Sequence, residues 1–86
     1  FAQVARWPHK ISGIINCCGM FFFKPLLDMP LADFRSVLEA NLISAFIVTQ
    51  QAVKLMRATG GRIIHLGSIS GHHGLANNSG YGTAKA

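Results

Sequence analysis

Two short runs of apolar, β-branched residues lie on either side of one long amphipathic stretch, and this order constrains the fold more than any other feature. The first run covers residues 11–16 (Ile-Ser-Gly-Ile-Ile-Asn) and the second covers residues 62–66 (Arg-Ile-Ile-His-Leu). Short runs of this kind are typical of buried strands. Two buried strands joined by a helix pair in parallel, so the sequence predicts a βαβ unit with a right-handed crossover.

The stretch between these runs is predicted to be one helix from Leu31 to about Arg57. Its apolar side chains recur at spacings of three and four, the period of a helix with one buried face, and Gly60-Gly61 ends it. The preceding residues 20–30 are predicted to be a loop on an apolar surface, and residues 1–7 the end of an earlier helix closed by Pro8. The apolar set of the long helix is Phe34, Val37, Leu38, Leu42, Ala45, Phe46, Thr49, Ala52, Val53 and Met56.

One βαβ unit is less than a dinucleotide-binding sheet needs, because such sheets contain several units. Half of the 86 residues are hydrophobic, which predicts a packed core. The fold class predicted is α/β, as a fragment of a doubly wound parallel-sheet (Rossmann-type) domain. The chain begins with Phe1 and stops at Ala86, where the last helix has barely begun. We therefore expect residues 1–86 to be the central part of a single domain.

Composition argues against several other classes of protein. The net charge is +5, but the lysines and arginines are scattered singly, which argues against nucleic acid as a partner. No uninterrupted apolar run approaches the ~18 residues of a membrane span. Cys17 and Cys18 are adjacent, whereas structural zinc sites space their cysteines by two to four residues. Two buried free thiols in a reducing compartment are expected, which favours a cytoplasmic protein without a metal site.

Four polar residues carry the chemistry of the chain. Tyr81 and Lys85 are four residues apart, on a helix that Ser79 is expected to cap, so their side chains share one face. Ser68 lies thirteen residues before the tyrosine. Asn41 falls on the apolar face of the long helix, where a buried amide needs hydrogen-bond partners. A tyrosine beside a lysine is a candidate proton donor.

These residues and their order resemble the short-chain dehydrogenase/reductase family along nearly the whole chain. Residues 16–19 (Asn-Cys-Cys-Gly) resemble the family's Asn-Asn-Ala-Gly strand-end motif, and residues 39–42 (Glu-Ala-Asn-Leu) resemble its helix asparagine. Residues 61–64 followed by Ser68 resemble its serine strand, and residues 81–85 its Tyr-x-x-x-Lys motif. The chain is similar to the branch that contains β-ketoacyl carrier-protein reductases and sugar or polyol dehydrogenases.

The resemblance implies an oxidoreductase that moves a hydride between NAD or NADP and a carbonyl or secondary alcohol. Tyr81 would be the general acid and base, and Ser68 would hydrogen-bond the substrate oxygen. Lys85 would hold the nicotinamide ribose hydroxyls and favour the tyrosine's ionised form, and Asn41 would hold a water that links Lys85 to solvent. These four would form the catalytic set.

The resemblance also implies that the cofactor is bound by Asn16, Gly19, Tyr81 and Lys85. It also places the phosphate-binding glycine-rich turn before Phe1 and the substrate loop after Ala86. The isolated chain is therefore expected to be inactive, and the full-length protein is expected to be a homo-oligomer, either a dimer or a tetramer.

The sequence departs from the family pattern where Cys17 and Cys18 replace an asparagine and an alanine, and where His65 stands at a position that is frequently asparagine. An alternative function, a non-catalytic Rossmann-fold binding or regulatory protein that retains these motifs, stays open. The sequence argues against a hydrolase nucleophile elbow, because neither Ser68 nor Ser70 has glycine both two residues before and two residues after it. His72 and His73 are expected to be exposed loop residues without a role.

Overall fold

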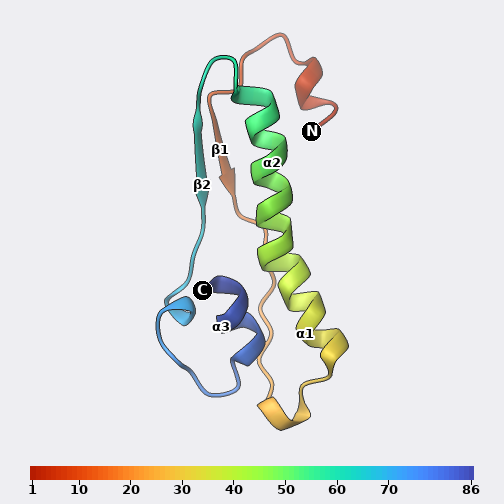
Figure 1. Ribbon diagram of the computed structural model, residues 1–86, viewed down its shortest axis with the longest axis vertical. Helices are drawn as coiled ribbons and strands as arrows, with labels where there is room; N and C mark the ends of the chain where they lie inside the picture. Colours follow the sequence, from red (N-terminus) through yellow and green to blue (C-terminus); the bar gives the residue numbers. More distant parts are fainter.

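The computed structural model describes residues 1–86 and confirms the α/β class with a parallel sheet (Figure 1). Strand β1 (Gly13–Asn16) pairs with β2 (Arg62–His65), with Gly13 opposite Arg62 and Asn16 opposite His65. Both strands therefore end at the same edge of the sheet. The remaining helices are α1 (Leu31–Leu38), α2 (Ser44–Met56) and α3 (Ser79–Lys85), and no helix is long and apolar enough to cross a membrane.

The crossover from β1 to β2 is a rod made of α1 and α2, which lie end to end in Figure 1. One uninterrupted α-helix was predicted here, and this is wrong in the middle, where residues Glu39–Ile43 form a single π turn. The N–H of Ser44 donates to the carbonyl of Glu39, five residues back. Single π turns inside α-helices occur frequently at functional sites, and this one carries Asn41.

The strands are shorter than predicted and are covered on one side only. Helix α2 runs along the sheet (Figure 1), yet Ile15 is 64% exposed and Ile64 is 50% exposed. The expectation of fully buried strands is therefore wrong for this face, because no element of the chain packs on it. Parallel sheets in α/β proteins are normally covered on both faces.

The largest cluster of buried residues lies between α1 and α3, beyond the ends of the strands. Val37, Tyr81 and Ala84 form it, with Phe22 and Leu38 packed around them. Gly71 lets the loop after β2 lie against α3, because a Cβ there would come within 2.5 Å of the Lys85 carbonyl oxygen. The core thus fixes the tyrosine helix to α1, directly before the π turn that carries Asn41.

Smaller differences concern the ends of elements. Residue Asn78 occupies the N-cap position of α3 and Ser79 is its first residue, so the predicted cap is off by one. Residues 1–7 contain only a short 3-10 turn, Val4–Arg6, in place of the predicted helix end. The predicted loop over residues 20–30 is confirmed, with one 3-10 turn at Leu26–Asp28.

Candidate active site

A cavity of about 270 Å³ lies where β1 and β2 end, and helix α3 forms one wall of it. Four of the predicted site residues come together there, namely Gly19, Asn41, Tyr81 and Lys85. The full lining is Cys17, Cys18, Gly19, Met20, Phe21, Asn41, Leu66, Gly67, Tyr81 and Lys85. Open α/β sheets bind their ligands at this edge, outside the carboxyl ends of the strands.

The lysine and the tyrosine face this cavity from successive turns of α3. The Lys85 ammonium lies 5.9 Å from the centre of the Tyr81 ring and donates a hydrogen bond of 3.0 Å to the Leu66 carbonyl. That carbonyl belongs to the residue directly after β2. The strand end therefore orients the lysine, a contact that residue types could not reveal because the acceptor is a backbone group.

The tyrosine is held by packing. Only 7% of Tyr81 is exposed, and its ring lies 4.5 Å from the ring of Phe21, centre to centre, at an interplanar angle of 33°. Phe23 contacts the same pair, 4.8 Å from Phe21 and 6.4 Å from Tyr81. Aromatic pairs at such distances add about 0.5–1.5 kcal/mol beyond burial. The contact between the rings of Phe21 and Tyr81 joins residues sixty positions apart, so local residue type and spacing could not predict it.

Asn41 ties the π turn to the segment that follows β1. Its Oδ1 accepts from the backbone N–H of Met20 at 3.1 Å, and its Nδ2 donates to the carbonyls of Met20 (3.0 Å) and Val37 (2.9 Å). Both amide hydrogens are thus used, and the residue is only 5% exposed. Because these three hydrogen bonds satisfy the buried amide, an asparagine is tolerated on this apolar face.

Gly19 is the closest backbone approach to this network. A Cβ at that position would come 2.6 Å from Asn41 Oδ1 and 3.5 Å from Lys85 Nζ, which is too close to the first atom for any side chain. Only glycine fits without moving the asparagine. The backbone of the cavity wall is consequently bare beside the lysine, which leaves room for a ligand.

Asn16 does not line the cavity but supports the segment that does. Its Oδ1 accepts from the N–H of Cys18 at 3.0 Å, so its Nδ2 is the atom that donates to His65 Nδ1 at 3.1 Å. Thr49 Oγ1 donates to the Ala45 carbonyl and hence accepts from His65 Nε2 at 2.8 Å. The tautomer with its hydrogen on Nε2 satisfies both contacts of His65, because Nδ1 then accepts and Nε2 donates.

Ser68 lies one residue beyond the lining of the cavity, after Gly67. Its Oγ accepts from the N–H of Ser70 at 3.1 Å. Because the hydroxyl acts there as an acceptor, its own proton stays available for donation. No hydrogen bond joins Ser68 to the phenol of Tyr81.

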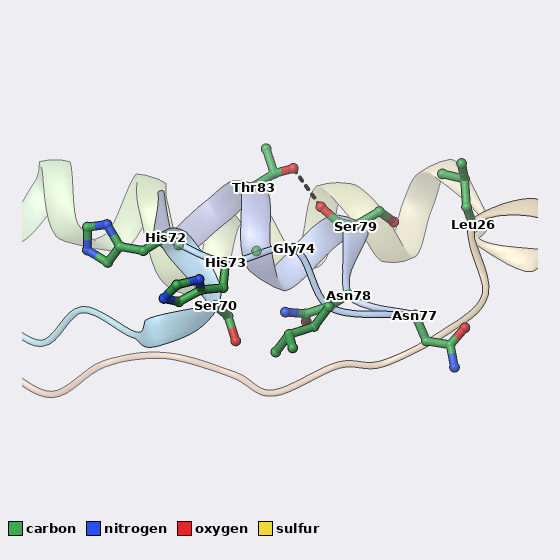
Figure 2. Close-up of a pocket in the computed structure, with 12 residues that line it drawn as sticks. Leu26, Ser70, His72, His73, Gly74, Asn77, Asn78, Ser79 and Thr83 are labelled. Atoms are coloured by element: carbon green, nitrogen blue, oxygen red, sulfur yellow. Dashed lines mark hydrogen bonds between the residues drawn. The ribbon is translucent and has the colours of Figure 1, made fainter.

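A second cavity, of about 400 Å³, shares no lining residue with the first (Figure 2). His72 and His73 are exposed there, as expected of loop residues. Asn78 is only 4% exposed, and its amide oxygen and nitrogen have no partner. No three histidine, cysteine, aspartate or glutamate side chains gather anywhere in the chain into a group that could hold a metal.

The two thiols were expected to be buried, and this is wrong. Cys17 and Cys18 are both free and exposed, because the chain leaves the sheet at Asn16 and the next residues form the wall of the cavity. The periodicity of the preceding strand does not extend beyond its last residue. Apolar character alone therefore misplaced the pair.

We expect His65→Leu to destabilise the protein by about 1–3 kcal/mol, because the buried Nδ2 of Asn16 would lose its acceptor. His65→Asn should cost less, since a side-chain amide oxygen can accept from Asn16. Urea unfolding of both variants measures this. His72→Leu, in the exposed loop, is the matched control. Equal urea midpoints for the two leucine variants would show that the hydrogen bonds of His65 do not stabilise the fold.

The fold and the cavity define a class, an α/β protein with a tyrosine and a lysine at the ligand-binding edge of a parallel sheet. The comparisons narrow that class. Residues 1–86 match the family described as short chain dehydrogenase, over the entire chain. The chain belongs to the short-chain dehydrogenase family.

Individual relatives agree with this assignment. The chain is 36% identical, over 100% of its length, to a 3-oxoacyl-[acyl-carrier-protein] reductase of Mycobacterium avium, of which it covers 34%. It is 35% identical, again over 100% of its length, to an acetoacetyl-CoA reductase of Cupriavidus necator, of which it covers 35%. The chain thus spans about a third of the length of these curated relatives.

Solved structures show the same fold. A putative gluconate dehydrogenase from Agrobacterium tumefaciens superposes with a TM-score of 0.90 at 28% identity, over 98% of this chain and 34% of that one. A 7α-hydroxysteroid dehydrogenase in complex with NADH and 7-oxo glycochenodeoxycholic acid superposes with a TM-score of 0.81 at 32% identity, over 88% and 30% of the two chains. Family membership and the NADH-bound relative support NAD or NADP as the cofactor.

Proposed function

We propose that the chain carries the proton-transfer centre of an NAD(P)-dependent oxidoreductase that interconverts a carbonyl and a secondary alcohol. The observation that carries this proposal is the shared cavity, in which Tyr81, Lys85, Asn41 and Gly19 meet at the strand ends. We further propose that residues 1–86 are the central part of a single NAD(P)-binding domain, which the open face of the sheet and the length of the relatives both support.

The residues present fit a nicotinamide cofactor. A bare backbone at Gly19 allows close approach, and the Lys85 ammonium lies beside it with hydrogens left to donate after its bond to Leu66. In this proposal Gly19, Tyr81 and Lys85 form the cofactor side of the cavity, and Asn16 belongs to the cofactor site as the support of the wall at Cys18. When bound, the nicotinamide supplies the hydride to the substrate carbon or takes it back.

Tyr81 moves the proton in this scheme. During reduction the phenol gives its proton to the carbonyl oxygen, and during oxidation the phenolate takes the alcohol proton. The ammonium of Lys85 lies 5.9 Å from the ring centre, and its positive charge stabilises the phenolate. As a general scale, two unit charges about 6 Å apart attract each other by about 3 kcal/mol at an effective dielectric near 20 and by under 1 kcal/mol in bulk water, so a lysine stabilises a phenolate strongly only in a sheltered cavity.

Ser68 and Asn41 support that step in different ways. The free proton of the Ser68 hydroxyl is assigned to the substrate oxygen, where it steadies developing negative charge. The Asn41 side chain donates both amide hydrogens to carbonyl groups, so its main assigned role is to position the segment from Gly19 to Met20. The resemblance also implies that Asn41 holds a water molecule. One lone pair of Oδ1 remains for that water, and this role stays a prediction.

Further properties of the full-length protein are part of the proposal. A homo-oligomer is supported by apolar side chains exposed on the crossover helices, among them Phe46 at 64% and Leu42 at 49%. A cytoplasmic location stays a prediction. The isolated residues 1–86 are expected to show no turnover, because the resemblance places the phosphate-binding turn before them.

The test is an assay of the purified full-length protein. Nicotinamide absorbance is followed with NADH and NADPH against a panel of 3-oxoacyl thioesters, keto sugar acids and oxosteroids, the chemistries that the relatives' names contain. We expect turnover of at least one carbonyl. Tight cofactor binding without turnover of any substrate would favour the non-catalytic alternative.

A further inference from the structure

Two adjacent thiols stand in the wall of the cavity that holds Tyr81 and Lys85. Cys17 and Cys18 both line this cavity, and both are free and exposed. The proposed proton transfer uses neither of them. The corresponding positions of the family's strand-end motif carry an asparagine and an alanine, so the pair is a feature of this chain that the proposed function does not explain.

The backbone around the thiols is held in place. The N–H of Cys18 donates to Asn16, and two residues further on both backbone groups of Met20 bond to Asn41. The short segment is therefore tied to β1 on one side and to the π turn on the other. Such bonds keep the two sulfur atoms at the cavity and not in a loop that swings away from it.

Accessible free thiols are the strongest nucleophiles among ordinary side chains, because their ionised form attacks electron-poor carbon. The cavity of about 270 Å³ is small enough for an organic adduct on either sulfur to fill much of it. Lys85 and the bare backbone of Gly19 would then be shielded from a ligand.

We propose that Cys17 and Cys18 form a covalent modification site through which soft electrophiles close this cavity. With a maleimide, the thiolate sulfur bonds to one carbon of the ring double bond. The π bond breaks, and the neighbouring carbon takes a proton from water, so no leaving group, oxidant or reductant is needed. Modification itself is independent of the proposed function, whereas the loss of cofactor binding that follows from it rests on that function.

The test treats the full-length protein with N-ethylmaleimide and maps adducts by peptide mass spectrometry. We expect adducts on Cys17, Cys18 or both in the folded protein, loss of NADH or NADPH binding as measured by cofactor fluorescence, and slower labelling when cofactor is present. The matched control is the double variant Cys17→Asn/Cys18→Ala, which restores the family's motif. It should bind cofactor before and after the reagent.

Two results would overturn the inference. One is a folded protein in which neither thiol is labelled while cysteines of the urea-unfolded protein react fully. The other is a double variant that loses cofactor binding to the reagent as fast as the wild type, which would place the sensitive group elsewhere. Adduct mapping and cofactor binding need no substrate. A protein without any turnover would therefore contradict the proposed function but not the modification site. The single variants Cys17→Asn and Cys18→Ala then show which sulfur reacts.

Discussion

Replacement of Tyr81 by phenylalanine is expected to lower kcat/KM of the full-length protein by about 10²–10⁴-fold, the contribution of a positioned general acid and base. The change removes one oxygen and keeps the ring, which is where the folding role lies. The ring packs against Phe21 and belongs to the cluster with Val37 and Ala84. Chemistry and stability are therefore separable at this residue.

The measurement pairs steady-state kinetics with cofactor binding and thermal unfolding. Loss of one hydrogen bond costs about 0.5–1.5 kcal/mol, so cofactor affinity should fall by roughly tenfold or less. The unfolding temperature should stay close to that of the wild type. Thr83→Val is the control on the same helix, since the Thr83 hydroxyl only bonds back to the Ser79 carbonyl.

Full activity of the phenylalanine variant on a substrate that the wild type turns over would contradict the proton-transfer role. A variant that unfolds would contradict a different point, the claim that the ring alone supports the core. Lys85→Met offers a second view of the same cavity, because it removes the ammonium and keeps a long side chain. It should weaken both cofactor binding and turnover.

Much of the architecture could be predicted because it follows from local periodicity. The two apolar runs and the helical spacing between them predicted a parallel strand pair around a crossover, and the pairing of β1 with β2 confirms it. Tyr81 and Lys85 were expected on one face for the same reason, and both reach one cavity. Periodicity of this kind is a property of neighbouring residues, so it survives without knowledge of the rest of the fold.

What could not be predicted depends on contacts between distant segments. The π turn carries Asn41, whose side-chain amide donates to the carbonyl of Val37 one turn back and to that of Met20 in the segment after β1. The bond of Lys85 to Leu66 joins residues nineteen apart through a backbone acceptor. Apolar residue type predicted burial for Cys17 and Cys18, whereas their place beyond the strand end leaves them exposed.

Asn41 shows both sides of this limit. Its position on an apolar helix face predicted a buried amide in need of partners, and it is buried with three hydrogen bonds. The identity of the partners came only from the fold, because Met20 lies twenty-one residues away. One residue thus links the local shape of the crossover helix to the wall of the cavity.

Asn41→Leu is expected to cost about 2–4 kcal/mol of stability, since a side chain of similar size would leave the N–H and C=O of Met20 and the carbonyl of Val37 without this partner. Each buried group left unpaired costs about 1–3 kcal/mol. The total expected is less than three such costs because Met20 is 38% exposed, so water can form hydrogen bonds with its backbone groups. Urea unfolding of the full-length protein gives the value. Ser36→Ala, which removes an exposed hydroxyl from α1, should stay within about 0.5 kcal/mol of the wild type.

The same substitution separates a positioning role from simple support of the fold. If Asn41 sets the path of the chain from Gly19 to Met20, the folded leucine variant should bind cofactor more weakly well below its unfolding midpoint, because the backbone beside Lys85 is released. Asn41→Asp keeps the acceptor for the Met20 N–H but loses both donors, and the added charge faces the carbonyls of Met20 and Val37. It should therefore be destabilised as well. A leucine variant with wild-type stability and wild-type cofactor affinity would show that the π turn and the cavity wall form without this amide.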